Sequence, residues 1–259
     1  MPLRKFLYEY GEREKSLIVV NRTEPQGIQQ LLENTFSGQP IRVDEHEIPL
    51  LGENLVLLVE DGDVVATSPL KELERTLLMI NSDLFITGTY GLEDVELPDV
   101  LRGLDEVPFH LRGYPESNKE KLLLILISRY IERVAYEQQG GTFRASFQRL
   151  SRMSDEIGTR KVYEQLADSE TTVHVYGVPD QSPPVEDGLV AHRGRSSDYR
   201  DSWFVLYQLP DGVTPPADST IPEAVGLLAI ENHDHVWDGY WTFSPDTVSA
   251  LDTHIAAEL

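Results

Sequence analysis

The sequence predicts an α/β (α+β) fold in which a small N-terminal α/β unit, residues 1–112, precedes a domain with an antiparallel sheet, residues 113–259. Three observations predict this fold. Residues 117–139 carry the strongest helix pattern in the chain. Before this helix, short apolar strands alternate with amphipathic helices. After it, several strands follow one another without intervening helices, which implies antiparallel pairing.

The expected central helix has defined ends. Ser117 and Glu120 form a capping box at its start, and Gly140 with Gly141 supplies a stop. Residues 122–127 are apolar without interruption, and a helix that is apolar all round packs on several sides. The apolar run is too short, and too closely flanked by charge, to cross a bilayer. We therefore expect a core helix between the two halves of the molecule.

The first half is expected to be compact up to residue 87 and irregular after it. The expected order is a helix at 2–10, a strand at 17–20, a helix at 24–36, a hairpin at 55–59 and 64–66, a helix opened by Ser68-Pro69, a strand at 83–87 and a short helix near 101–104. None of the strand-to-helix junctions carries a glycine-rich phosphate loop.

The second half begins with a strand, residues 142–147, that we expect to be half-buried because its apolar residues alternate. The expected order continues with a helix at 156–167 (core contacts Ile157, Val162, Tyr163 and Leu166), a strand at 171–178, a long loop at 179–200, a strand at 203–209, a loop at 210–222, strands at 224–231 and 240–243, and a helix opened by Ser244-Pro245. Helices at both ends would cover one sheet face and leave the other free for a pocket or a partner. This layout is that of sensor folds such as GAF and PAS domains, an analogy of architecture alone.

The composition is strongly acidic. Acidic residues number 44 against 22 basic ones, the net charge is −22, six of the basic residues are Lys, and cysteine is absent. Such a charge suits a salt-rich cytoplasm of the halophilic kind. It argues against direct binding to nucleic acid or to an anionic membrane surface. The first residues lack the apolar core of a secretory signal, so a cytoplasmic location is expected.

Several stretches of the second half resemble the DICT family, a sensory domain found alongside diguanylate cyclases and two-component systems. These stretches are NKEKLLLILISRYIERVA at 118–135, FRASFQ at 143–148, YEQLADSETTVHVYG at 163–177, WFVLY at 203–207, GLLAIE at 226–231 and GYWTFSPDTV at 239–248. The first half is similar to the part that accompanies this domain in haloarchaeal members. The resemblance implies signal input, in which the domain binds a ligand or another protein and passes on a conformational state. It names no ligand, and no binding residue is carried over from it.

The candidate ligand-binding residues are Arg144, Phe147, Gln148, Tyr163, Trp203, Glu231 and Trp241. Gln148 follows a strand end, and its amide either fixes the polar edge of a ligand or satisfies loop backbone. Trp203 and Trp241, with Tyr240, either line a pocket or form plain core. Glu231 ends an apolar strand, and if it is buried it needs a cation such as Arg144 or Arg149.

No catalytic or metal site is expected. His233-Asp234-His235, with Glu231 nearby, has the types and spacing of metal ligands, but in a turn between strands we expect these side chains to be solvated. There is no G-x-S-x-G elbow, and His192 falls in an expected loop.

The leading hypothesis is therefore a non-enzymatic sensory protein that binds a small ligand or a signalling partner and relays a conformational state through the central helix. The relay would run to the first half or to a second copy in a homodimer. Expected partners are a histidine kinase, a response regulator or a transcription regulator. The alternatives are a ligandless interaction adaptor in such a pathway and an uncharacterised hydrolase.

Overall fold

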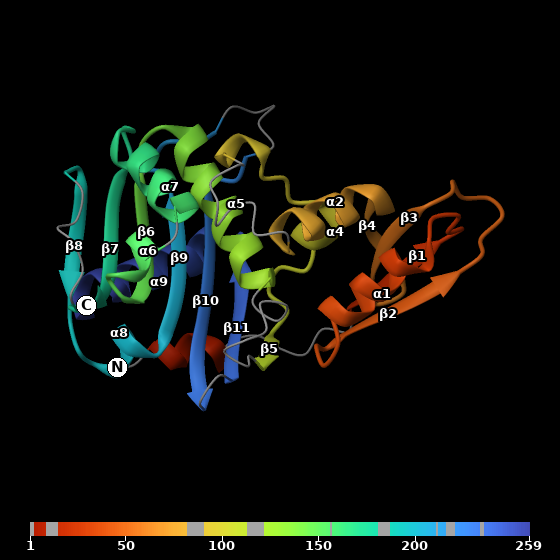
Figure 1. Ribbon diagram of the computed structural model, residues 1–259, viewed down its shortest axis with the longest axis horizontal. Helices are drawn as coiled ribbons and strands as arrows, with labels where there is room; N and C mark the ends of the chain where they lie inside the picture. The colour runs from red at the N-terminus through yellow and green to blue at the C-terminus, as the bar shows by residue number, and fades with distance from the viewer. Residues whose placement is uncertain are drawn as a thin grey trace.

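The computed structural model describes residues 3–8, 15–81, 91–112, 122–155, 157–180, 187–210, 212–215, 221–233 and 236–259. Two mixed sheets organise these residues (Figure 1). The first sheet has the order β2-β1-β3-β4, and the second has the order β5-β11-β10-β9-β6-β7-β8. The expected α/β class is confirmed. The expected strand at 83–87 and the capping box at Ser117 lie outside the described residues.

The first sheet combines a parallel pair with a hairpin. β1 (Lys15–Val20) pairs in parallel with β2 (Ile41–His46), and α1 (Gln26–Thr35) connects them. β3 (Leu55–Glu60) and β4 (Asp63–Pro69) form the expected hairpin. Asp61 and Gly62, both with positive φ, form its two-residue turn. α2 (Leu70–Asn81) follows, with Leu70, Leu73 and Leu77 buried as expected.

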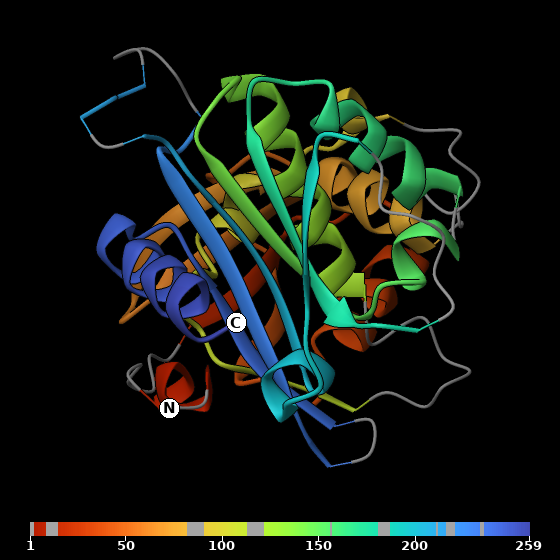
Figure 2. The same ribbon diagram turned by 90° about the vertical axis from the view of Figure 1, so that its left-hand side faces the viewer.

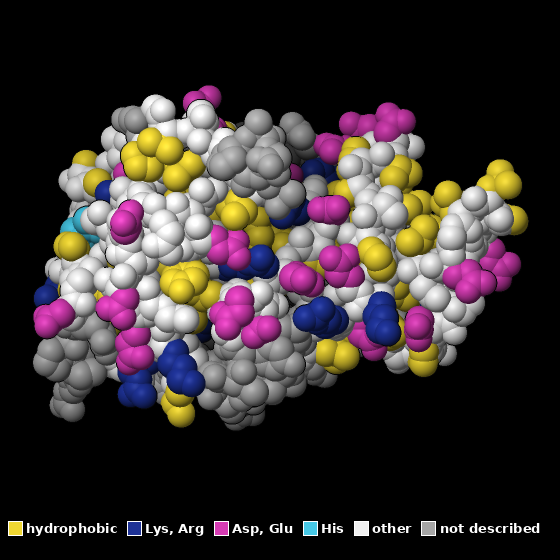
Figure 3. Space-filling model, turned by 90° about the horizontal axis from the view of Figure 1, so that it is seen from above, with side chains coloured by type: hydrophobic (Ala, Val, Ile, Leu, Met, Phe, Trp, Pro, Cys, Tyr) yellow, Lys and Arg dark blue, Asp and Glu magenta, His cyan; other side chains and the backbone are white. Residues whose placement is uncertain are grey.

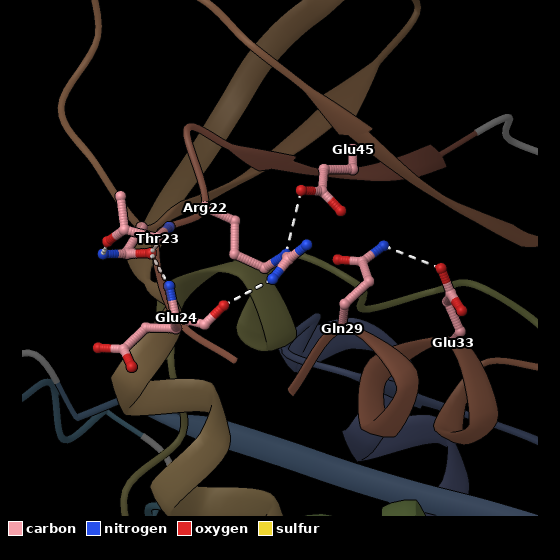
Figure 4. A network of polar contacts seen from close by, with 7 residues as sticks. Arg22, Thr23, Glu24, Gln29, Glu33 and Glu45 are labelled. Atoms are coloured by element: carbon pink, nitrogen blue, oxygen red, sulfur yellow. Dashed lines mark hydrogen bonds and ion pairs between the residues drawn. The ribbon is translucent and has the colours of Figure 1, made fainter. Parts of the chain in front are cut away.

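A polar network closes the end of β1 where the chain enters α1 (Figure 4). The side-chain oxygen of Asn54 accepts hydrogen bonds from the backbone N–H groups of Thr23 and Glu24, at 2.7 and 3.1 Å. Arg22 contacts Glu45 at 3.0 Å and also donates to the Glu24 carbonyl. Free N–H groups at such a junction are what a phosphate loop offers to its ligand. Because Asn54 occupies two of them here, the structure agrees with the expectation that this junction is no phosphate loop.

A short irregular segment joins the two sheets. It contains η2 (Leu92–Asp94) and α4 (Asp99–Arg102), and it ends in β5 (Phe109–Arg112), which pairs with β11 of the second sheet. The outer edge of β5 is blocked by Gln39, whose amide donates to the His110 carbonyl at 2.7 Å and accepts from the His110 N–H at 2.8 Å. Gln39, which lies between α1 and β2, therefore covers this edge of the second sheet.

The second sheet is antiparallel from β5 to β6 and parallel from β6 to β8. Its remaining strands are β6 (Thr142–Arg149), β7 (Thr172–Val178), β8 (Leu189–Arg193), β9 (Ser202–Gln208), β10 (Ala224–His233) and β11 (Val236–Thr242). The expected long loop at 179–200 is wrong in its second part, which contains β8 and the short helix α8 (Ser197–Arg200). β8 was missed because its residues are only partly buried and follow a stretch rich in Pro and charge.

Helices cover both faces of this sheet (Figure 2). One face packs against α5 (Leu122–Gln138) and α7 (Ile157–Ala167), which α6 (Arg152–Asp155) precedes. The opposite face packs against α9 (Pro245–Glu258) and the 3-10 helix η1 (Leu3–Tyr8). The expectation of a free face is therefore wrong. Consequently β6 is buried on both sides, not half-buried.

Several local predictions can be checked against burial. Val162, Tyr163 and Leu166 of α7 are buried as expected, but Ile157 is 51 % exposed, because it stands at the first position of the helix. The expected stop of the central helix is confirmed: Gly140 and Gly141 have positive φ. A side chain at Gly141 would meet the Gln208 carbonyl at 2.3 Å.

Candidate functional site beneath helix α5

The second sheet separates the seven candidate residues. Phe147, Tyr163, Trp203 and Trp241 belong to the cluster on the α5 side. Arg144 points to the opposite side, where it pairs with Asp252 of α9. The structure thus brings four of the seven onto one face and excludes Arg144 from it. We take the face under α5 as the candidate site.

A buried charge pair is the most unusual feature of this face. Arg129 and Glu132, both on α5, are joined at 2.6 Å, and their side chains are 7 % and 5 % exposed. Arg129 also donates to the hydroxyl of Thr159 on α7 at 2.6 Å. Tyr163 of α7 is hydrogen-bonded to Glu132. These four residues therefore connect α5 to α7 through polar contacts inside an apolar core.

Burial controls the protonation of this group. It raises the pKa of the Glu132 carboxyl, while the charge of Arg129 opposes the shift. Burial, followed by the charge of Glu132, raises the pKa of Tyr163 well above its ordinary value. The sequence analysis missed Arg129 and Glu132. Their signal was available, because two opposite charges three residues apart follow directly after the apolar run of the same helix.

Aromatic side chains surround the charge pair. Phe147 of β6 meets Tyr163 edge-to-face with ring centroids 5.0 Å apart. Trp203 of β9 donates its indole N–H to Ser128 of α5 at 3.1 Å and meets Trp237 of β11 at 6.3 Å, with the rings perpendicular. Two of the candidate residues, Phe147 and Trp203, therefore hold α7 and α5 against the sheet.

An aromatic row continues along β11 towards the first unit. Trp241 lies 5.8 Å from Phe109 of β5, and Phe243 lies 6.2 Å from Tyr130 of α5. Trp241 is only 2 % exposed, and its indole N–H has no acceptor among the described residues. A buried N–H group without a partner is uncommon, and water or a ligand often supplies the acceptor. Among the candidate residues, Trp241 is therefore the one whose buried N–H group lacks a hydrogen-bond acceptor among the described residues.

Gln148 is held by the protein on both ends of its amide. It donates to the Ser202 carbonyl at 2.8 Å, and Arg152 donates to its side-chain oxygen. Its backbone has a positive φ of 52°, which is unfavourable for a residue with a side chain. Gln148 therefore lies at the bulge at the end of β6, and its amide bonds to the backbone of β9 and to the side chain of Arg152.

The opposite face holds a second polar network. Arg144 donates to Asp252 and to the Tyr176 hydroxyl, the latter at 2.7 Å. Tyr176 stacks on His192 with centroids 4.3 Å apart, and His192 contacts His174 at 2.9 Å. Burial, then the charge of Arg144, lowers the pKa of His174 to about 4, and the same causes lower the pKa of His192.

Glu231 does not join Arg144 as the sequence suggested. Arg144 takes Asp252 as its carboxylate, and the Glu231 backbone carbonyl accepts a bond from Arg4 of η1. Asp234 and His235 of the candidate metal triplet lie outside the described residues. Within the described ranges, no group of three His, Cys, Asp or Glu residues could hold a metal ion. No helix that the structure describes is long and apolar enough to cross a membrane.

The fold and this face define a mixed α/β protein with a charge pair sealed beneath its central helix. Residues 99–212 match the family model DICT, a sensory domain in diguanylate cyclases and two-component systems. The resemblance to this sensory-domain family stated above is therefore confirmed over the matched residues. Searches of curated proteins and of solved structures found no match.

Proposed function

We propose that this protein is a non-enzymatic signal-input protein in which α5 relays the state of the candidate site to the first unit. The carrying observation is the position of α5, which bonds to both units within little more than one helical turn. Ser128 and Arg129 bond to Trp203 and Thr159 on the sheet side. Arg133 donates to the carbonyl of Val95, just after η2.

These contacts supply a physical route for the relay. A rotation or shift of α5 on the sheet would move Arg133 relative to Val95, because Arg133 and the residues that bond to the sheet side belong to one rigid helix. The junction of the two units is hollowed, with hydrophobic atoms on its floor and charged groups of both signs at its rim (Figure 3). A ligand or partner that binds one position of α5 more tightly would shift the population towards that position.

The ligand that best suits this face is a small, flat, largely apolar molecule with one hydrogen-bond acceptor. Phe109, Trp237 and Trp241 would supply its apolar contacts. The N–H of Trp241 would donate to its acceptor. We place the protein in a cytoplasm rich in salt, with a histidine kinase, response regulator or transcription regulator receiving the signal.

We also propose the division into two units. The second unit would take in β5, which completes its sheet, and η1, which packs on its far face. The first unit would then be residues 15 to about 98, centred on the four-stranded sheet.

The test begins with protein purified at high KCl from a salt-adapted host, whose denatured extract is analysed by mass spectrometry. A stoichiometric flat compound supports the proposal. Its affinity is then compared in Trp241→Phe and Trp203→Phe. Loss of the Trp241 donor should weaken binding about tenfold, while Trp203→Phe, whose indole already bonds to Ser128, should change it less. Equal effects of the two variants would argue against Trp241 as the donor.

A ligandless interaction adaptor is the second candidate function, and exposed apolar side chains on the first unit favour it. Leu50 is 96 % exposed, Val64 55 % and Val65 50 %. If the extract is empty and a pull-down recovers a partner that Val64→Lys abolishes, the adaptor function replaces the sensory one.

A further inference from the structure

We propose that two copies of this chain pair through the free edge of β8, extending the seven-stranded sheet across a two-fold axis. The inference does not depend on the proposed ligand. β8 is the last strand of its sheet, and the described part of the chain places no strand beside it. Figure 2, which looks at this side of the molecule, has β8 at the front of the sheet. An uncovered edge strand presents unpaired backbone groups to any strand that can approach.

The two edges of this sheet are treated differently. At the β5 edge, Gln39 uses both ends of its amide to occupy the N–H and carbonyl of His110. No comparable side chain meets the backbone of β8 within the described residues. β8 also lacks Lys and Pro, two residues that commonly protect an edge. One edge is therefore blocked and the other is open.

The side chains of β8 suit a second copy. Val190 is 44 % exposed although it is apolar. The strand Leu189–Arg193 has no acidic residue in a chain with 44 of them. Two copies of a protein with a net charge of −22 repel each other, so a contact between them has to avoid placing acidic groups opposite one another. β8 meets that condition.

Charge complementarity fixes the register. An antiparallel two-fold centred on Ala191 places Val190 opposite His192 of the partner subunit. The same two-fold places Asp187 opposite Arg195 of the partner subunit, and this pair occurs twice. Both side chains are exposed, and neither forms an ion pair within the described residues. Asp187 and Arg195 lie just outside β8, so their attraction would act at the two ends of the paired strands.

The end residues limit the backbone pairing to this short strand, which Asp187 and Arg195 flank on either side. Gly188 has a positive φ of 97°, and a side chain there would meet the Ala167 carbonyl at the end of α7 at 2.9 Å. At Gly194 a side chain would collide with the Tyr199 ring. Five residues per copy bury little surface, so we expect a dissociation constant on the order of micromolar or weaker.

Sedimentation velocity over a concentration series tests the pairing. The wild-type protein should convert from monomer to dimer as its concentration rises. Val190→Lys should prevent the conversion, because a lysine on each edge opposes pairing, while Val190→Thr should retain it as the matched control. A wild-type protein that stays monomeric at millimolar concentration overturns the proposal.

Charge exchange tests the register. Asp187→Arg and Arg195→Asp should each weaken the dimer about tenfold, because each places like charges opposite one another at two positions. The double variant D187R/R195D restores both pairs and should recover the wild-type affinity at the same salt concentration. Circular dichroism of the monomer should be unchanged in all three. A double variant as weak as the singles would overturn this register, since a loss of β8 structure cannot be repaired by exchanging charges.

Discussion

Arg129 and Glu132 form an ion pair inside the protein, 2.6 Å apart and almost fully shielded from solvent. Their contacts with Thr159 and Tyr163 make the pair a connection between α5 and α7. A buried pair of this kind is weak support for stability, because desolvation offsets the attraction. It is, however, costly to break from one side, which makes it suited to holding α5 in place against α7.

Removal of one charge should therefore destabilise the fold strongly. Glu132→Gln leaves Arg129 buried without its carboxylate, and the free energy of unfolding should fall by about 3–5 kcal/mol. Glu137→Gln, which breaks the half-exposed pair with Arg133, is the control and should lower it by less than about 1 kcal/mol. Denaturant titration measures both. The double variant R129M/E132L should recover most of the loss, and failure to do so would show that packing, not charge, explains the single variant.

The stability of the protein should depend on His174 in mildly acidic solution. Its pKa is lowered from 6.5 in the unfolded chain to about 4 in the fold. Between these values the unfolded chain binds the additional proton, so stability is retained above pH 6.5 and is lost as the pH falls towards 4. Thermal unfolding at pH 7 and pH 5 should show a smaller drop in Tm for His174→Gln than for the wild type. The exposed His46→Gln is the control, and an equal drop in all three proteins would contradict the assignment.

Gln39 should protect the edge of the second sheet. Gln39→Ala removes two hydrogen bonds to His110, and the His110 amide should exchange with solvent much faster. The free energy of unfolding should fall by about 1–2 kcal/mol. Gln30→Ala, an exposed site on α1, is the control and should leave exchange at β5 unchanged. Unaltered exchange at His110 in the first variant would mean that other groups protect this edge.

Asn54 should stabilise the chain segment that leads into α1. Asn54→Ala removes the acceptor of the Thr23 and Glu24 amides and places alanine at a φ of 55°. Unfolding measurements should show a loss of about 1–2 kcal/mol. Asn54→Gly tolerates the backbone angle but still lacks the oxygen, so it should fall between the wild type and alanine. If glycine matched the wild type, the side-chain bonds would contribute nothing measurable.

Helical periodicity was sufficient to predict most of the helices, because α1, α2, α5, α7 and α9 each bury one stripe or a full apolar run. β2 could not be predicted in this way. Only Ile41 of that strand is buried, and its remaining residues are as polar as a loop. What defines β2 is its parallel pairing with β1, a contact between distant segments that no local pattern records.

The candidate site was predicted only in part, because contacts between distant segments of the chain also determine it. The aromatic residues were found because large apolar side chains in strands are buried almost wherever they occur. The separation of Arg144 from these aromatic residues could not be predicted, because it depends on η1 and α9, from opposite ends of the sequence, packing together on the other face of the sheet. The partner of Arg144 follows from that packing, since Asp252 is on α9.

The strand order of the second sheet shows that the segment matched by the family model is shorter than the segment needed to form the sheet. The family match spans residues 99–212, yet β10 and β11 lie between β5 and β9 and come later in the chain. A fragment cut to the match would keep β5 and lose the two strands that join it to the rest. The smallest piece worth expressing for structural study therefore runs through α9, and mutational scans restricted to the matched segment would miss β10 and β11.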